Sequence, residues 1–344
     1  MIIRSRAPMR IYFGGGGTDI SPYPEEKGGA VLGATINKFV YGTLIPKYGE
    51  NIQLVSEHHK QSAAFGLRDA PSYGDSLDFI KAVIQVMGIK HGLDLFMRGD
   101  LPPESGLGSG SSAVIAAIGL VNYLKTIRTD EMPLNNYEIA ELAYKIMKQV
   151  SGREQGRQNQ YASVFGGLNL IEFKGGSNVT VSPLKLKKDA ILELEKNLLL
   201  VYVGSRGSEK DASKIIVSQQ ASYLLKEKIE ILGKLKEITY SQHKALLRGD
   251  FVHFGELINE AWINKKKLNP LMTNDWLEKV HSTGLKAGAI GGRLMGAGGG
   301  GHMIFYCDID KEHVVAKELE KLGAKITSFS FEFDGLQTWK LGEF

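Results

Sequence analysis

The 344-residue chain has a single cysteine, Cys307, and therefore cannot form a disulfide within itself. This excludes the class of small secreted domains that depend on disulfides, and a reducing cytoplasm is the expected location. A dense basic block is also missing, since 42 Lys and Arg residues face 38 Asp and Glu. So small an excess gives no reason to expect nucleic acid as a partner, but it suits anionic small ligands.

Long apolar runs are likewise absent from the sequence, and we expect no leader segment. We expect no membrane as a partner, because no apolar run approaches membrane-spanning length and Met1–Arg4 resembles the start of a strand. The length suits two domains, and we place their boundary after residue 175, giving domains 1–175 and 176–344. The longest basic cluster, Lys265 to Lys267, predicts the solvated end of a helix.

Glycine, in contrast, is abundant, with 41 residues. The first glycine tract, residues 14–17, follows an apolar strand and ends in Thr18 and Asp19. Consecutive glycines indicate an unusual backbone or the close approach of a ligand. A carboxylate at the exit can accept hydrogen bonds from neighbouring hydroxyls, as on a sugar. The simpler alternative is that Asp19 caps a turn.

A second glycine tract lies in the stretch 102–113, which leads directly into the apolar helix predicted from Ala113 onward. Unpaired N–H groups at such a loop, together with the helix dipole, form an anion site that most often holds phosphate. Serine hydroxyls add donors or a Mg²⁺ ligand. A flexible connector is the alternative, but the Pro-Pro lead-in and the abrupt helix favour phosphate.

Two further segments complete the pattern. The stretch 151–161 is rich in hydrogen-bonding groups between apolar elements, which indicates a site, or else a solvated connection between helices. The third glycine tract, 296–301, stands between two predicted strands. His302, directly after it, is predicted to begin a strand and not to act as a base or metal ligand. Three such tracts imply a shared cleft where backbone meets ligand.

In this order, the three tracts resemble the GHMP kinase superfamily, which includes galactokinase, homoserine kinase, mevalonate kinase and phosphomevalonate kinase. Within it, the segments 4–20 and 158–167 are similar to the sugar 1-kinase branch of heptose 7-phosphate kinases and the kinase portion of fucokinase. The resemblance covers nearly the whole chain. It implies an α+β, two-domain fold with the active-site cleft between the domains.

The resemblance also implies a reaction, the transfer of the γ-phosphoryl group of ATP to the anomeric hydroxyl of a sugar or sugar phosphate, either a hexose or a heptose 7-phosphate. It implies catalytic roles for Arg10 and Asn159, and a Mg²⁺ ion held by Ser111 and Ser112. The residues implied for ATP are Pro103, Ser105, Gly106, Leu107, Gly108, Ser109, Gly110, Ser111 and Ser112. The residues implied for the acceptor are Gly16, Gly17, Thr18, Asp19, Gly298, Gly299 and Gly300.

The chain departs from this family pattern at two places. Relatives carry Asp-Gln-Tyr where this chain has Asn159-Gln160-Tyr161, and an asparagine cannot take a proton. An acidic Mg²⁺ ligand is also expected near residues 146–149, where no carboxylate stands; Glu141 and Glu154 are the nearest.

Four hypotheses follow: a kinase that works without a base, a kinase with reduced turnover, a sugar- or nucleotide-binding pseudokinase, and a GHMP kinase for another small alcohol. Intact glycine loops favour an active kinase, and Thr18-Asp19 favours a polyhydroxylated acceptor. A homodimer is left open.

Overall fold

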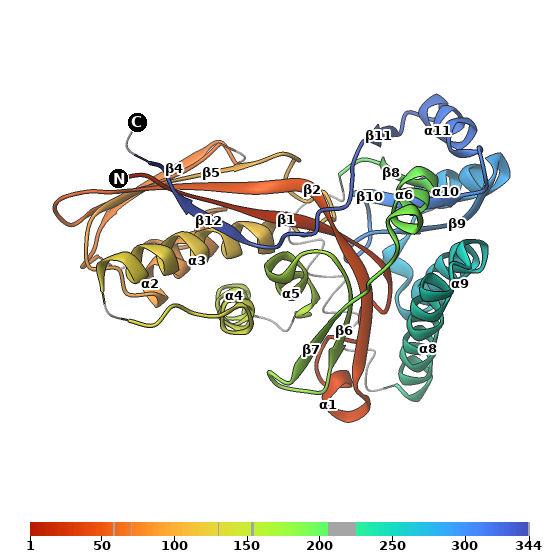
Figure 1. Cartoon of the computed structure of the whole chain (residues 1–344), viewed down its shortest axis with the longest axis horizontal. Coiled ribbons are helices and arrows are strands. Elements are labelled where there is room, and N and C mark those ends of the chain that lie inside the picture. Colours follow the sequence, from red (N-terminus) through yellow and green to blue (C-terminus); the bar gives the residue numbers. More distant parts are fainter. Residues whose placement is uncertain (58, 70, 130, 153–154, 206–224, 343–344) are drawn as a thin grey trace.

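The computed structural model describes residues 1–57, 59–69, 71–129, 131–152, 155–205 and 225–342. The described residues form an eight-stranded and a four-stranded sheet with helices packed against both, which confirms the predicted α+β class. In Figure 1, helices α2 to α5 lie on one face of the larger sheet, and α8 to α11 gather around the smaller sheet at the other end of the molecule.

The larger sheet has the strand order β12-β1-β2-β5-β3-β4, and β6 and β7 continue from β2. Its strands are β1 (Ile3–Gly14), β2 (Gly29–Pro46), β3 (Asn51–Ser56), β4 (Gln61–Gly66), β5 (Leu93–Gly99), β6 (Leu168–Phe173), β7 (Val179–Pro183) and β12 (Gln337–Lys340). Its helices are α1 (Tyr23–Lys27), α2 (Asp78–Val86), α3 (Ser109–Arg128), α4 (Asn136–Ser151) and α5 (Gln158–Phe165).

The smaller sheet has the order β11-β8-β10-β9. Its strands are β8 (Leu198–Tyr202), β9 (Ala289–Leu294), β10 (His302–Cys307) and β11 (Lys325–Thr327). The helices of this half are α6 (Lys188–Asn197), α8 (Lys226–Arg248), α9 (Phe251–Leu268), α10 (Asp275–Ala287), α11 (Glu312–Lys321) and the short 3-10 helix η1 (Pro270–Met272). The sequence predicts a helix over residues 210–247; its part before residue 225 lies outside the described residues, and residues 226–247 lie within α8.

The apolar sequence of residues 29–46 predicts a pair of strands, but in the structure these residues form the single 18-residue strand β2. Its first half pairs with β6 on the same side on which its second half pairs with β5. A register shift between Pro8 and Met9 of β1 bends the β1–β2 ladder between these halves. Such a bulge reorients the chain without ending the strand, so two ladders can share one long strand.

Helix α3 is the central helix of the larger sheet. It is apolar on nearly all sides, which suits a helix enclosed by the core, and its residues Val114 to Val121 are buried. Among the described helices, it alone has the length and hydropathy of a membrane span, and 61% of its most apolar window is buried inside the fold.

The predicted boundary at residue 175 falls between β6 and β7, which pair with each other in the larger sheet. The chain returns to this sheet once more at its end, where β12 pairs antiparallel with β1. The larger sheet therefore contains strands from both ends of the sequence, and β1 and β12 lie side by side in Figure 1.

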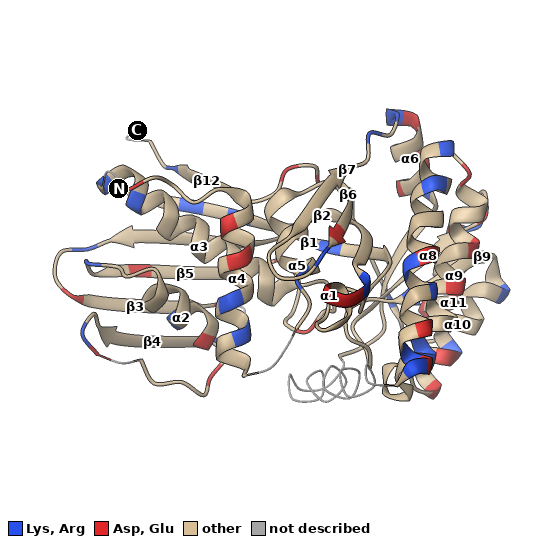
Figure 2. Ribbon diagram, turned by 90° about the horizontal axis from the view of Figure 1, so that it is seen from below, with Lys and Arg blue, Asp and Glu red and all other residues tan. Residues whose placement is uncertain are grey.

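Close packing of α9 on β9 positions part of the site. A Cβ on Gly291 would lie 2.0 Å from the carbonyl oxygen of Gly255, so both backbones approach closely because these residues are glycines. On the outside of this half, basic and acidic residues are interspersed along the helices (Figure 2).

Candidate active site

A cavity of about 620 Å³ lies where the two sheets meet. Its lining comes from β1, the first glycine tract, the loop before α3, the ends of α4 and α5, and from α9, β9 and the third glycine tract. The cavity therefore brings all three glycine tracts and the polar segment 151–161 together.

The loop before α3 presents its backbone to this cavity. Gly106 and Gly108 have φ of +81° and +82°, a conformation that glycine adopts without strain. Helix α3 begins at Ser109, and within the described residues no side chain caps its N-terminus. The first amides of the helix and its positive dipole end are thus available to an anion.

The residues predicted to bind ATP divide into two groups. Pro103, Gly106, Gly108, Ser109, Gly110 and Ser111 line the cavity. Ser105, Leu107 and Ser112 are buried behind it, and the Ser112 hydroxyl donates to the carbonyl oxygen of Pro8 at 2.9 Å.

The third glycine tract supports this loop from behind. A Cβ on Gly301 would lie 2.7 Å from the Ser105 carbonyl oxygen, and His302 Nδ1 donates to that same oxygen at 2.7 Å. His302 begins β10, as predicted, and burial lowers its pKa. Gly296 and Ala297 line the cavity, whereas Gly299 N donates to Met272 on the side of η1.

Gly298 and Gly300, also predicted to contact the acceptor, are outside the cavity lining. A Cβ on Gly298 would lie 2.7 Å from Met272 Cα, so this glycine packs against backbone.

The two predicted catalytic residues meet in the cavity. Arg10 Nε donates to Asn159 Oδ1 at 2.9 Å, and Arg10 Nη1 donates to the Gly106 carbonyl oxygen at 2.6 Å. The guanidinium also lies over the ring of Tyr12, 4.8 Å from its centroid. Arg10 therefore links the loop before α3 to the start of α5.

Asp19 is fully buried and lies behind the cavity wall. Its Oδ2 accepts a hydrogen bond from Gln158 N at 3.0 Å, and its Oδ1 accepts from Gln158 Nε2 at 2.9 Å. Burial raises the pKa of the Asp19 carboxyl, and the Gln158 amide and the Lys265 ammonium oppose that rise. The sugar-binding role of Asp19 stays a prediction; the contacts show that it joins the first glycine tract to α5.

Of the other acceptor residues predicted in this tract, Gly16 and Gly17 line the cavity. Thr18 is buried, and its hydroxyl donates to the Gly15 carbonyl oxygen at 2.8 Å.

Sequence reasoning missed two buried cations that line the cavity, Lys265 and Arg293. The prediction of a solvated helix end is wrong for Lys265, which is 6% exposed and donates to the Gly16 carbonyl oxygen. Arg293 is 3% exposed, and its Nη1 donates to the Phe13 carbonyl oxygen at 2.6 Å.

A signal for Lys265 was present in the sequence. The buried residues of α9 include Ile258, Ala261, Trp262, Lys265 and Leu268. This spacing of three and four residues places Lys265 on the apolar face of the helix. A lysine on such a face is buried for a reason, because its charge requires a partner.

The cavity wall around Lys265 and Arg293 is therefore mainly basic. Burial, with the nearby Arg293, lowers the pKa of Lys265 to about 7, while Asp19 opposes the change. Burial, with the nearby Arg10, lowers the pKa of Arg293 to about 10. Each shift shows that the cationic form is held at a cost.

The donors near Ser111 do not fit a Mg²⁺ ion held by the protein. Ser111 Oγ lies 3.6 Å from Met147 Sδ, and a thioether is too soft a ligand for Mg²⁺. Glu141 is bound instead by Tyr161 at 2.9 Å and Arg157 at 3.3 Å, and Glu154 lies outside the described residues. Among the residues that the structure describes, no cluster of three His, Cys, Asp or Glu side chains forms a metal site.

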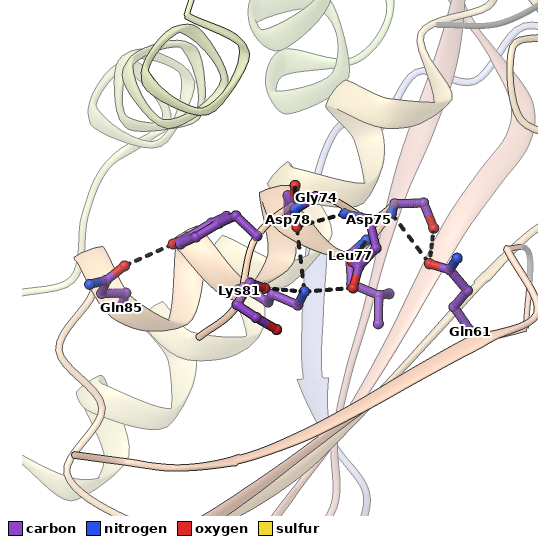
Figure 3. Close-up of polar contacts among 10 residues, drawn as sticks. Gln61, Gly74, Asp75, Leu77, Asp78, Lys81 and Gln85 are labelled. Atoms are coloured by element: carbon purple, nitrogen blue, oxygen red, sulfur yellow. Dashed lines mark hydrogen bonds and ion pairs between the residues drawn. The ribbon is translucent and has the colours of Figure 1, made fainter. Parts of the chain in front are cut away.

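A buried lysine fixes another part of the cavity wall. Lys81 Nζ donates to Asp75 at 2.7 Å and to the Ser72 carbonyl oxygen at 2.6 Å, and it lies 3.4 Å from Asp78 (Figure 3). Burial alone would raise the pKa of Asp75, but the hydrogen bonds from Lys81 and from the Leu77 amide, together with the charge of Lys81, more than offset this and the pKa is lowered. The loop 72–78, with Asp75 and Ser76 on the cavity, is thereby anchored to α2.

Comparisons with known proteins agree with this arrangement. Residues 77–167 match the family described as GHMP kinases N terminal domain, and residues 242–325 match GHMP kinases C terminal. A D-glycero-alpha-D-manno-heptose 7-phosphate kinase of Campylobacter jejuni is 31% identical over 98% of this chain and 99% of its own.

Solved structures give the same result. A D-glycero-D-manno-heptose 1-phosphate kinase from Bacteroides thetaiotaomicron superposes with a TM-score of 0.80 at 28% identity, over 99% of this chain and 100% of its own. A putative sugar kinase from C. jejuni superposes with a TM-score of 0.79 at 29% identity, over 99% and 98% of the two chains.

Proposed function

The chain belongs to the GHMP kinases, and on this basis we propose that it transfers the γ-phosphoryl group of ATP to the anomeric hydroxyl of a sugar or sugar phosphate. The observation that carries the proposal is that one cavity contains both a site suited to the phosphates of ATP and a site suited to an acceptor. The loop 106–111 and the N-terminus of α3 suit the phosphates of ATP, while the first glycine tract and Asn159 suit an acceptor. The similar heptose kinases support a sugar as that acceptor.

Positioning and charge neutralisation account for most of the catalysis of phosphoryl transfer. The backbone amides of the loop and the dipole of α3 would stabilise the phosphates, and Arg10 would stabilise the charge that develops on the transferred group. Because the donors near Ser111 do not fit a metal held by the protein, these groups of the chain itself carry the neutralisation in our proposal. Bound Mg²⁺, a cytoplasmic location and a homodimer stay predictions.

Asn159 acts as a donor in this scheme. Its Oδ1 accepts from Arg10, so its NH₂ group is left to donate toward the reacting oxygens. The new bond joins the anomeric oxygen to the γ-phosphorus, and the bond from that phosphorus to ADP breaks. The hydroxyl proton passes to a phosphate oxygen or to water, which an anomeric hydroxyl permits because it is more acidic than an ordinary alcohol.

The test measures ADP release from ATP with D-glycero-D-manno-heptose 7-phosphate, the neutral heptose, mannose, galactose and fucose. We expect turnover with at least one of them, and ³¹P-coupled ¹³C NMR of the product should place the new phosphate on C1. Nucleotide binding without turnover of any acceptor contradicts the proposal.

A pseudokinase is the second candidate, because Asn159 and Met147 stand where a base and a metal ligand would be useful. Asn159→Asp separates the two. If the native chain is an active kinase without a base, kcat of N159D stays within about tenfold of the native value. Asn159→Leu, which lacks the donor, should lose about 10²-fold or more, the usual cost of removing a transition-state hydrogen bond. A rise of more than 100-fold in N159D would show that the native chain is impaired at this position.

A further inference from the structure

We propose that Lys265 is the general base of the reaction and takes the proton of the acceptor hydroxyl on its uncharged amine. This inference rests on the proposed function, in which Asn159 cannot accept a proton and the proton would otherwise pass to a phosphate oxygen or to water. Lys265 lies on α9, lines the cavity and is 6% exposed. Lysines that are buried in this way serve proteins as bases near neutral pH.

The contact with Gly16 places the amine on the acceptor side of the cavity. Lys265 Nζ donates to the Gly16 carbonyl oxygen. A Cβ on Gly16 would lie 2.9 Å from Lys265 Nζ and 4.0 Å from Gln158 Oε1. Gln158 directly precedes Asn159 in α5, and both residues line the cavity. An acceptor that lies against the first glycine tract is therefore between Lys265 and the start of α5.

This position of Lys265 does not require a positive charge. A neutral amine has two N–H groups and one lone pair, so it can donate to the Gly16 carbonyl oxygen and accept from a hydroxyl at the same time. The next lysine of α9, Lys266, forms an ion pair with Glu278 at 2.8 Å, whereas no ion pair among the described residues involves Lys265. The partner that holds Lys265 is thus a neutral backbone oxygen.

The surroundings of Lys265 favour its uncharged form. Burial, together with Arg293 on β9 and Arg10 on β1, lowers the pKa of Lys265 to about 7, and Asp19 at the end of the first tract opposes the change. Both oxygens of Asp19 accept hydrogen bonds from Gln158. A base whose pKa lies near the working pH is both available and strong enough to take a proton in the transition state.

Other titratable groups of the cavity lining are less suitable as the base. Burial raises the pKa of Tyr12, and its hydroxyl donates to the Gln158 carbonyl oxygen at 2.5 Å, so Tyr12 keeps its proton. The pKa of Asp75 is lowered despite its burial, which makes this carboxylate a weak base. Arg293, with a pKa of about 10, remains cationic near neutral pH. His59 also lines the cavity and has to be tested directly.

The proton and the bonds balance in one step. The O–H bond of the acceptor breaks while an N–H bond forms on Lys265. The acceptor oxygen bonds to the γ-phosphorus, and the bond from that phosphorus to ADP breaks. The new ammonium keeps its hydrogen bond to Gly16 and interacts with the Asp19 carboxylate. It returns the proton to solvent after the product has left the cavity.

The experiment measures steady-state kinetics of the whole protein between about pH 6 and 9, with ATP and heptose 7-phosphate, or the tested sugar that turns over fastest. The native kcat should rise with pH to a plateau, with a midpoint at or above 7, because bound phosphates favour the ammonium form. Lys265→Ala should lower kcat about 100-fold or more and remove the rise. Lys267→Ala, at an exposed lysine of the same helix, and His59→Asn should keep the rise.

Two further measurements separate a base from a cation that only binds an anion. Lys265→Arg keeps the positive charge but cannot act as a base, because a guanidinium stays protonated. We expect it to lose as much of kcat as K265A. Small primary amines added to K265A should restore part of the turnover, and the restored rate should rise with the basicity of the amine. Calorimetric titration with AMP-PNP shows that each variant is folded.

A native kcat in K265A, or in K265R, overturns the role of Lys265 as the base and leaves the kinase function standing. A restored rate that does not depend on the basicity of the amine also overturns it. If the rise with pH disappears in H59N and persists in K265A, His59 is the titrating group and the inference is wrong. If no acceptor is phosphorylated by the native protein, the proposed kinase function fails, and the role of Lys265 with it.

Discussion

The side chain of Met147 lies beside the phosphate loop, where a divalent metal ion that accompanies ATP would contact it. Its sulfur lies 3.6 Å from Ser111 Oγ, at the cavity surface. Met147→Glu would place a carboxylate in reach of a metal that accompanies ATP. We expect the ratio of AMP-PNP affinities measured with Mg²⁺ and with EDTA to rise about tenfold in M147E, the lower end of what a metal-supporting contact contributes.

Met147→Leu is the matched control, because it keeps the volume and adds no charge. Calorimetric titration of AMP-PNP into each variant gives the two ratios. The same ratio in both variants would show that Met147 does not adjoin the metal position.

Lys265 also links stability to pH. Its pKa is about 7 in the folded protein and the ordinary value is 10.5, so between these values the unfolded chain holds a proton that the folded chain does not. The free energy of unfolding therefore rises with pH across this window, and the gain is lost as pH falls toward 7. Urea unfolding of the ligand-free protein from pH 7 to 9.5 measures the slope.

K265M should have a flatter slope than the native protein, and Lys267→Met should keep the native slope. Because other groups titrate in the same range, the difference between these two variants is the informative quantity. Equal slopes in K265M and K267M would place the Lys265 pKa near its ordinary value.

At the scale of elements, the third glycine tract acts as a support for the phosphate loop. Gly301 has φ of +97°, and a Cβ there would lie 2.7 Å from the Ser105 carbonyl oxygen. Gly323 has the same φ of +97°, and a Cβ there would meet nothing within 4 Å. Alanine at either position should cost about 1–2 kcal/mol of stability through backbone strain.

Only Gly301→Ala should also displace the loop, and we expect it to raise KM for ATP at least tenfold and more than KM for the acceptor. Gly323→Ala should keep both constants near the native values. Steady-state kinetics with each substrate varied in turn tests this, and equal KM for ATP in the two variants would separate the tract from the phosphate loop.

Sequence periodicity predicts some elements well, and the reasons are local. Helix α4 begins with a capping box at Asn135 and carries a regular apolar face, so the helix that apolar spacing predicts over residues 137–150 lies within one residue of both its ends. Strand β2 shows where local reasoning ends. Both halves of β2 have the conformation of a strand, but they pair with different strands, β6 and β5. Which strand pairs with which depends on the whole sheet and cannot be inferred from the local sequence.

At the scale of the whole molecule, the glycine tracts could be assigned to one cleft because each is a recognisable backbone signal. Lys265 and Arg293 could not be assigned to this cleft, because the apolar spacing around Lys265 predicts its burial but only the packing of the whole fold brings α9 and β9 to Gly16. For Asp19, the sequence predicted more than the structure shows. Its motif marked it for ligand binding, and only the fold shows its oxygens bound to Gln158.

The return of the chain to its first sheet has a consequence for stability. Strand β12 pairs with β1 over residues 337–340, and a Cβ on Gly119 of α3 would lie 2.9 Å from side-chain atoms of Leu336 and Thr338. A chain that ends at Gly335 would lose this strand and uncover the β1 edge and part of α3. We expect its Tm to fall by several degrees, since losing a whole strand costs several kcal/mol and each 1 kcal/mol shifts Tm by about 1–2 °C in a protein of this size.

A chain that ends at Leu341 is the control, because it keeps β12 and the bond from Leu341 N to the Ile2 carbonyl oxygen at 2.9 Å. Since β12 is outside the cavity lining, KM values of the shorter chain at low temperature should match those of the control. An unchanged Tm would mean that β12 adds little to the sheet. A lowered Tm with altered KM for the acceptor would mean that the C-terminal strand holds β1, and with it Arg10 and the first glycine tract, in the geometry that the cavity requires.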